Sequence, residues 1–386
     1  MTTVILLGFV SMLTDISTEM VYPLLPLYLT STLGAGPAVV GVIEGIAESL
    51  AGLLKVYSGY LSDRLRRRKA LALVGYGSST LGKAFLYLST SWGWVLIGRV
   101  VDRFGKGIRT APRDALIADA SGTGNLGRSF GLHRAMDTLG AVIGVAVAYR
   151  ILVANQQHYR GVFMLSLIPA ALGVGLLCFA KETRRGRAAA ETVTNPFAGW
   201  KALSPRLKAF FALTLVFALG NSSNQFLLLK ARDVGFSPAQ VVLLYLMFNL
   251  VYSAVSYPAG RLSDKIGRKT LLVCGYALYG LVYIGFGLVR DARYIWALFG
   301  MYGLYSAFTE GIEKALVSEL SAEENRATML GIHASLVGIG LLPASLIAGF
   351  LWRWLGASAP FYFGGVMGLL AAVGMGFVVP RTVRHA

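Results

Sequence analysis

Cysteine and charged residues are both scarce in this chain. Of its 386 residues, two are cysteines and 14% carry a charge. Cys178 and Cys274 fall within apolar stretches, so no disulfide framework is available, and we expect both to be small packing residues. With 55% hydrophobic residues and a mean hydropathy of +0.61, the composition lies well outside the range of soluble globular domains.

Sequence motifs of common enzymes are also missing. No Gly-x-x-x-x-Gly-Lys-Ser/Thr loop occurs, which argues against a pump driven directly by nucleotide hydrolysis. Neither a nucleophile elbow nor a metalloprotease motif is present. We therefore expect no enzyme, no cofactor and no bound metal. A receptor stays open as an alternative, although it would normally carry an added signalling segment.

Apolar runs recur along the whole chain. Extended through flanking glycine and serine, each run approaches the roughly 20 residues that a helix needs to cross a bilayer. The sequence predicts an all-α membrane protein with twelve transmembrane helices. The predicted spans lie near residues 4–29, 38–58, 70–90, 92–117, 128–151, 160–180, 207–229, 238–259, 270–289, 293–317, 328–351 and 359–379.

One segment of the chain occurs twice, about 200 positions apart, which indicates two homologous halves fused in tandem. Its two copies are Gly59-Tyr-Leu-Ser-Asp63-Arg64 and Gly260-Arg-Leu-Ser-Asp264-Lys265. The correspondence continues at the same spacing: Gly75-Tyr76 matches Gly275-Tyr276, and Gly131-Leu-His133 matches Gly331-Ile-His333. We expect an N-terminal six-helix bundle at 1–180, a cytoplasmic linker at 181–206 and a C-terminal six-helix bundle at 207–386. Duplicated halves in an apolar chain are typical of secondary transporters.

The net charge of +17 follows the predicted topology. The larger share of the 36 Lys and Arg residues falls on one face, chiefly at 64–69, 181–208 and 261–269. By the positive-inside rule that face is cytoplasmic, and both termini lie there. The excess charge then reflects topology and contact with anionic lipid, not nucleic acid binding. We expect a multi-pass protein of the cell membrane, the inner membrane in a bacterium.

The duplicated loop resembles the signature loop of the major facilitator superfamily, Gly-x-x-x-Asp-Arg/Lys-x-Gly-Arg-Arg/Lys. The second copy matches throughout, whereas Arg66 replaces the glycine in the first. In that family the loop's acidic residue is thought to meet a helix end and a basic group, which latches the cytoplasmic side shut. Enforcement of topology is the alternative for the arginine run. The gating candidates are Gly59, Asp63, Arg64, Arg68, Gly260, Asp264, Lys265 and Arg268, together with Arg113 and His133.

The fifth span resembles the glycine-rich antiporter motif of proton-driven drug exporters at Gly131, Gly140 and Gly144. Val145 stands where that motif has proline after the third glycine. The resemblance implies export, whereas small residues at such spacing also serve plain helix packing. Both interpretations stay open.

Ionisable residues inside predicted spans are functional candidates, because a charge in a bilayer is costly. On an ideal helix of about 100° per residue, those of the fourth span lie within an arc of about 140° and form one polar stripe. The stripe consists of Arg99, Asp102, Arg103, Lys106, Arg109, Arg113 and Asp114. The proton-coupling candidates are the acids Asp15 and Glu19, Glu44 and Glu48, and Asp137. Permanent pairing of these acids with arginines of the fourth span is the alternative.

In the major facilitator superfamily the first, fourth, seventh and tenth spans line the central cavity. By that resemblance Asp15, Glu19 and the polar stripe would face substrate. Alignment of the seventh span with the first places Asn221 near Asp15 and Gln225 near Glu19, so ionisable groups concentrate in the N-terminal half. The candidates for the substrate cavity are Arg99, Asp102, Arg103, Lys106, Arg109, Asn221, Gln225, Asn249, Tyr252 and Glu310.

Three transport functions stay open at this point. The first is proton-coupled export of a small drug-like or cationic compound, by alternating access between the halves. The second is proton-coupled transport of an anionic solute, such as a carboxylate, phosphate ester or metal chelate, through the basic side chains of the polar stripe. The third is transport of a divalent metal by Asp15, Glu19, Glu48 and His133, although no compact ligand motif is present. In each case the partners are a small-molecule substrate, protons and the lipid bilayer, and a monomer suffices.

Overall fold

The computed structural model describes residues 2–65, 67–120, 126–155, 158–180, 205–320 and 326–378. Nearly all of these residues are helical, and no strand occurs among them. Most of the predicted linker at 181–206 lies outside the described residues. The side-chain surroundings of Gly59, Asp63, Arg64 and Asp264 are not described either, so the latch predicted at these positions also lies outside what the structure describes.

Fourteen α-helices and one short 3₁₀ helix make up the described chain. They are α1 (Thr2–Val21), η1 (Tyr22–Leu24), α2 (Leu25–Ser31), α3 (Pro37–Leu65), α4 (Arg68–Tyr87), α5 (Trp92–Ala120), α6 (Leu126–Ala154), α7 (Tyr159–Leu177), α8 (Pro205–Gly220), α9 (Gln225–Asp233), α10 (Pro238–Ile266), α11 (Arg268–Leu288), α12 (Ala292–Leu320), α13 (Arg326–Leu355) and α14 (Ala359–Val378).

These helices form twelve transmembrane segments. The 3₁₀ helix η1 joins α1 to α2 without a gap, and α8 and α9 lie on one span from Pro205 to Asp233. The break at η1 follows from Pro23 and Pro26, because proline removes a backbone donor and crowds the preceding turn. The prediction of an all-α protein with twelve transmembrane helices is confirmed.

Nine of the twelve segments in the described chain are apolar enough to cross a membrane by composition alone. The other three are α4, α5 and α12. In α5 the polar stripe lowers the hydropathy, yet Arg99, Asp102, Arg103 and Arg109 are all buried. Neighbouring parts of the protein therefore shield these four side chains from lipid.

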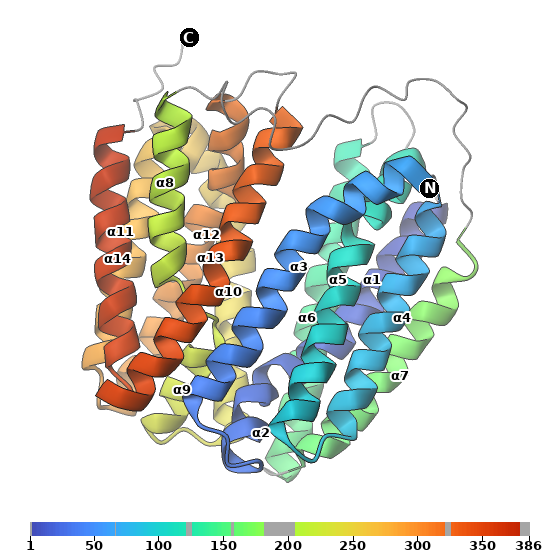
Figure 1. Ribbon diagram of the computed structural model, residues 1–386, viewed down its shortest axis with the longest axis horizontal. Coiled ribbons are helices and arrows are strands. Elements are labelled where there is room, and N and C mark those ends of the chain that lie inside the picture. Colours follow the sequence, from blue (N-terminus) through green and yellow to red (C-terminus); the bar gives the residue numbers. More distant parts are fainter. Residues whose placement is uncertain are drawn as a thin grey trace. The chain divides into compact units, whose positions relative to one another are not determined.

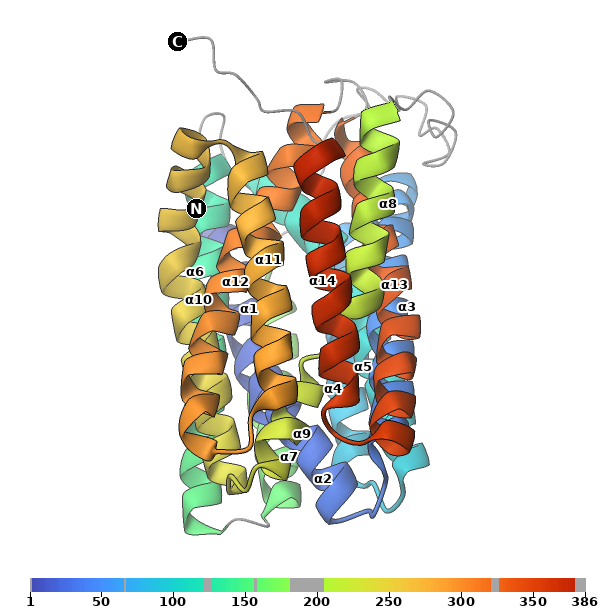
Figure 2. The same ribbon diagram turned by 90° about the vertical axis from the view of Figure 1, so that its left-hand side faces the viewer.

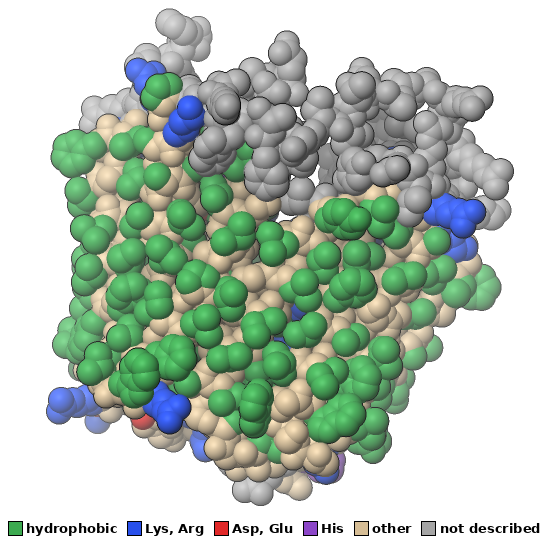
Figure 3. All heavy atoms as spheres, in the orientation of Figure 1, with side chains coloured by type: hydrophobic (Ala, Val, Ile, Leu, Met, Phe, Trp, Pro, Cys, Tyr) green, Lys and Arg blue, Asp and Glu red, His purple; other side chains and the backbone are tan. Residues whose placement is uncertain are grey.

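Apolar side chains cover the outer faces of the helices. Large ones are exposed, including Phe377 at 86% and Tyr257 at 73%, as expected for a surface solvated by lipid. In Figure 3 hydrophobic side chains spread over the visible helix faces, and most of the Lys and Arg side chains lie toward the helix ends. Cys178 and Cys274, predicted to be small packing residues, are also exposed.

The chain divides into two compact units. The first comprises Met1–Ala35, Ile46–Val193 and Ser237–Leu243, and the second comprises Gly36–Gly45, Thr194–Phe236 and Leu244–Ala386. Within the first unit α1 packs against α6 and α7, and α4 packs against α5 and α7 (Figure 1). Within the second, α11 packs against α12 and α14, while α8 packs against α13 and α14 (Figure 2).

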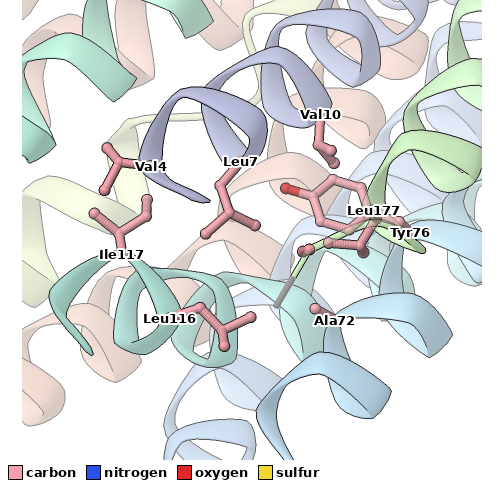
Figure 4. Close-up of a cluster of buried hydrophobic side chains, with 9 residues drawn as sticks. Val4, Leu7, Val10, Ala72, Tyr76, Leu116, Ile117 and Leu177 are labelled. Atoms are coloured by element: carbon pink, nitrogen blue, oxygen red, sulfur yellow. The ribbon is translucent and has the colours of Figure 1, made fainter. Parts of the chain in front are cut away.

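A buried apolar cluster lies within the first unit (Figure 4). Its side chains come from α1, α4, α5 and α7, and the ring of Tyr76 lies among them. Lipid tails are as apolar as these side chains, so close packing, not removal from water, stabilises the contact. The labelled members are Val4, Leu7, Val10, Ala72, Tyr76, Leu116, Ile117 and Leu177.

Glycines let α4 and α5 approach closely enough to set the position of the polar stripe. A Cβ atom on Gly82 would lie 2.6 Å from the Asp102 nitrogen, and one on Gly105 would lie 2.3 Å from the Gly75 carbonyl oxygen. Both distances are too short for a real contact, so the two backbones touch at these positions. Asp102 is thereby held against α4.

The glycine-rich motif of the fifth span packs α6 against α1. Cβ atoms on Gly140 and Gly144 would each lie 2.4 Å from a carbonyl oxygen of α1, those of Met12 and Ile16. These two glycines therefore serve helix packing, whatever they contribute to export. The surroundings of Gly131 lie outside the described side chains.

Candidate functional site

A cluster of buried charges lies inside the first unit, where α3, α4 and α5 meet. We call Glu48, Lys83, Arg99, Asp102 and Arg103 the ionic cluster. The Asp102 carboxylate lies 3.6 Å from Lys83 Nζ and 3.6 Å from Arg99 Nη1. The Glu48 carboxylate lies 3.5 Å from Arg99 Nη2 and 2.9 Å from Arg103 Nε. Lys83 and Arg99 are each 2% exposed, so both charges are balanced by side chains of the protein.

Lys83 was not among the residues predicted from sequence. It lies in the middle of the third predicted span between Gly82 and Ala84, and an isolated lysine at such a depth is itself a signal of function. The expected ion pairing of Asp102 is present in the structure. Glu48, proposed as a proton carrier, also pairs with arginines of α5.

Hydrogen bonds continue from the stripe to α1 and α6. Arg109 donates to Ser79 Oγ, and its guanidinium lies 4.6 Å from the centroid of the Tyr76 ring. The Tyr76 hydroxyl is 2.9 Å from Ser11 Oγ, and His133 Nε2 is 2.8 Å from the same oxygen. Ser11 therefore joins α1, α4 and α6 at one point.

Two more predicted residues meet at this junction. Arg113 Nη1 donates to Ser11 Oγ over 3.4 Å and pairs with Asp114 over 2.8 Å. Asp137 Oδ2 lies 3.4 Å from His133 Nδ1, one turn along α6. The side chains of Arg113, His133 and Asp137 thus belong to one polar network within the first unit.

Asp15 interacts electrostatically both with the ionic cluster and with this junction. Its carboxylate is in electrostatic contact with Lys83, Lys106 and Asp137. Glu19, one turn further along α1, also has a noncovalent partner in the structure. The two acids of α1 are therefore part of the polar interior of the first unit.

Glu44 and Glu48 have separate surroundings, although one helical turn separates them. Glu44 belongs to the second unit and is 1% exposed, and Ser223 Oγ donates to its carboxylate over 3.4 Å. Gln225, two residues beyond Ser223, is fully buried. The two acids therefore lie in different surroundings.

Tyrosines fill the interior of the second unit at positions where the first unit carries charge. By the 200-residue repeat, Tyr283 corresponds to Lys83 and Tyr302 to Asp102. The rings of Tyr279 and Tyr283 stack at 4.1 Å, and Tyr302 lies 6.0 Å from Tyr283. The Tyr279 hydroxyl donates to the Gly220 carbonyl over 2.8 Å.

The amides of the seventh span join this tyrosine cluster. Asn221 Nδ2 donates to the Tyr305 hydroxyl over 3.3 Å, and the Tyr302 hydroxyl donates to Asn224 Oδ1 over 2.8 Å. Asn249, by contrast, donates to the Tyr245 carbonyl of its own helix over 2.9 Å. The side-chain nitrogen of Asn249 is therefore hydrogen-bonded to the backbone of α10.

Glu310 is an exposed carboxylate in the middle of a spanning helix. The Tyr252 hydroxyl donates to it from α10 over 2.5 Å. The Tyr252 ring stacks on Phe248 at 6.3 Å, and Phe248 lies 5.3 Å from Tyr302. The Glu310 carboxylate therefore lies at the edge of a surface formed by the aromatic rings of Tyr252 and Phe248 in the second unit.

The described gating candidates that belong to the duplicated loop lie at or near helix ends. Arg268 Nη1 donates to the Ala315 carbonyl over 2.8 Å, which ties the start of α11 to α12. Arg68 has a noncovalent partner, Gly260 is half-buried, and Lys265 is exposed. Within the described chain no group of three or more His, Cys, Asp or Glu side chains could hold a metal ion.

Helices that are apolar outside and enclose ionic and hydrogen-bonding side chains define a multi-pass membrane transporter. The sequence model of the Major Facilitator Superfamily matches residues 7–229 and 209–386. The chain belongs to this superfamily, and the predicted resemblance is confirmed.

Two relatives illustrate the range of similarity. An uncharacterized MFS-type transporter of Methanocaldococcus jannaschii is 38% identical over 381 residues, which cover 97% of this chain and 94% of the relative. The multidrug resistance protein MdtH of Photorhabdus laumondii subsp. laumondii is 25% identical over 368 residues, 91% of this chain and 88% of MdtH.

Solved transporter structures share the fold. The nucleoside transporter NupG superposes with a TM-score of 0.84 at 12% identity, covering 98% of this chain and 100% of its own. A D-xylose–proton symporter has a TM-score of 0.77 at 18% identity, with 98% of each chain covered. At such identities the likeness concerns the fold alone.

Proposed function

We propose that this protein is a secondary active transporter that exports a small drug-like or cationic compound in exchange for protons. It would work by alternating access, as a monomer in a cell membrane, with both termini in the cytoplasm. We expect no catalytic activity. The similarity to MdtH, a multidrug resistance protein, supports the direction and the substrate class.

The observation that carries proton coupling is the set of acids inside the first unit. Asp15 on α1 and Asp137 on α6 interact electrostatically within this unit, so the charge of one acid affects the other. Asp137 contacts His133, which contacts Ser11, so a change in the charge of Asp137 would alter the electrostatic potential at α1. We assign proton transfer first to Asp15 and Glu19, with Asp137 as their partner.

Glu310 would recognise a cationic substrate. A carboxylate that is exposed within a spanning helix must face water or a ligand, since lipid would not solvate it. The neighbouring rings of Tyr252 and Phe248 offer faces that attract cations and apolar rings alike. We assign substrate binding to this surface, with Asn221 as a polar contact.

An anionic solute is the second candidate. In the ionic cluster the bases Lys83, Arg99 and Arg103 outnumber the acids Glu48 and Asp102. Lys106 is in electrostatic contact with this cluster and adds positive charge. This excess would attract an anion. The ion pairs already formed by Arg99 and Arg103 weaken that attraction, which is why the first candidate is preferred.

The test is accumulation of a fluorescent lipophilic cation in efflux-deficient bacteria that express the chain. Wild-type cells should accumulate less dye than cells with empty vector, and a protonophore should remove the difference. Asp15→Asn should abolish proton-driven efflux, whereas Glu310→Gln should weaken efflux of cations more than that of neutral dyes. Asp291 is an exposed acid in the turn before α12. The variant Asp291→Asn is the matched control and should export the dye as the wild type does.

Equal accumulation in all cells, with the protein shown to be in the membrane, would contradict cation export. Uptake or efflux of a labelled organic anion, lost in Arg103→Gln, would then support the second candidate.

A further inference from the structure

We propose that Glu313 and His333 form a second proton-binding site, in the second repeat, that holds one proton between the carboxylate and the imidazole. The sequence places Glu313 on α12 and His333 on α13, and neither residue was a site candidate. The role of the site in transport rests on the proposed function, whereas proton binding itself does not.

The two side chains meet in the interior of the second unit. Glu313 Oε2 lies 3.2 Å from His333 Nε2, and His333 is 4% exposed. The Tyr276 hydroxyl of α11 donates to the other carboxylate oxygen, Oε1, over 2.9 Å. The Phe210 ring of α8 stacks on the imidazole at 6.2 Å. Four helices therefore enclose this pair.

Charge balance explains why the pair should bind a proton. A buried carboxylate without a countercharge is costly, and a proton on the imidazole or on the carboxylate removes the uncompensated charge. Tyr276 donates one hydrogen bond to Glu313, which orients the carboxylate but does not cancel its charge. Loss of the shared proton would leave a single negative charge among Tyr276, Phe210 and Phe217, whose ring stacks on Tyr276 at 4.1 Å.

The equivalent place in the first repeat has a different charge arrangement. Position 113 is arginine where position 313 is glutamate, and Arg113 reaches Ser11, which also contacts His133. A permanent cation beside His133 discourages a second positive charge there. At His333 the residue in the equivalent position is the acid Glu313, whereas His133 has both a cation near it and an acid partner on its own helix, Asp137, 3.4 Å away.

Other charged and titratable groups on the packed helices complete the surroundings of the pair. On α12 these are Tyr305, Glu310 and Lys314, and both Glu310 and Glu313 interact electrostatically with Tyr305. Lys314 and the α8 residue Lys208 each have a noncovalent partner of their own. The α11 residue Arg268 donates to the Ala315 carbonyl.

The site can be titrated directly because the chain has only four histidines. Nitrogen-15 spectra of histidine-labelled protein in detergent, recorded from about pH 5 to pH 9, would follow each imidazole, and His333→Asn would assign the resonance. In wild type we expect His333 to titrate within this range. In Glu313→Gln its midpoint should shift, because the carboxylate beside the imidazole is lost.

Two further variants keep the measurement decisive. Glu310→Gln removes an acid three residues earlier on the same helix and should move the midpoint much less. Tyr276→Phe removes one hydrogen bond to the carboxylate and should preserve titration even if Glu313→Gln does not fold. A wild-type His333 that stays in one protonation state throughout, or a midpoint unchanged in Glu313→Gln, would overturn the proposal.

The role in transport is tested separately with a substrate that the wild type exports. Glu313→Gln should shift the pH dependence of efflux, while Lys314→Gln should not. An unchanged pH profile in Glu313→Gln, together with a shifted His333 midpoint, would show a proton site that coupling does not use. A chain that exports no substrate would contradict the proposed function and leave the titration result intact.

Discussion

Asp102 shows how much depends on a single side chain in the ionic cluster. Its carboxylate lies between Lys83 on α4 and Arg99 one turn earlier on α5, and it is only 4% exposed. No water is needed to balance either cation while the carboxylate is present. Removal of one partner from a buried ion pair leaves an uncompensated charge, which costs more than the pair contributes.

We expect Asp102→Asn to destabilise the folded protein by about 3–5 kcal/mol, because it leaves two buried cations without this carboxylate. Adding Lys83→Met should recover part of the loss, since the double variant removes one cation with the acid. Thermal unfolding in detergent of the wild type, both single variants and the double variant gives the coupling energy. Additive losses would mean that Lys83 and Asp102 act independently.

The charged residues of α5 were predictable because their spacing on one helical face is a local property of the sequence. Their partners were not, since Glu48 lies on α3 and Lys83 on α4, and contact between them depends on packing. The same reason explains the absence of Glu313 and His333 from the predicted sites. The duplication of His133 at position 333 was visible, but the acid that each histidine meets was not.

At the scale of helices, glycine decides which pairs of elements touch. Gly82 faces α5 at backbone contact, whereas Gly77 on the same helix has no atom within 4 Å of an added Cβ. The apolar periodicity of α4 could not distinguish these two glycines before the structure was known. The helix break at η1 follows from Pro23 and Pro26, which are visible in the sequence, but the break between α8 and α9 contains no proline.

Gly82→Ala should therefore destabilise the protein by about 1–3 kcal/mol, because α4 and α5 must separate to admit a methyl group. Gly77→Ala is the matched control and should be neutral or slightly stabilising, since alanine favours helix over glycine by up to about 1 kcal/mol. Unfolding temperatures in detergent compare the two. Equal stability would show that α4 and α5 can move apart without cost.

On the scale of the whole molecule, the two repeats share one helical arrangement but differ in the side chains that occupy their interiors. Contacts at equivalent positions recur: Tyr76 meets Ser11 in the first unit, and Tyr276 stacks on Phe217 in the second. The same alignment pairs Asp15 with Asn221, as predicted from sequence. The first unit is thus filled with charge and the second with tyrosine, which fits a division between proton coupling and substrate recognition.

The distribution of positive charge makes a prediction for the whole chain. If both termini and the central linker are cytoplasmic, alkaline phosphatase fused within residues 181–204 should be inactive in bacteria, because the enzyme folds only after export. The same enzyme fused after Asp291, in the turn between α11 and α12, should be active. Green fluorescent protein, which fluoresces when it stays inside, should show the opposite pattern. Active phosphatase at the linker would reverse the assigned orientation, and with it the face at which the duplicated loop and its acids Asp63 and Asp264 could act as a cytoplasmic latch.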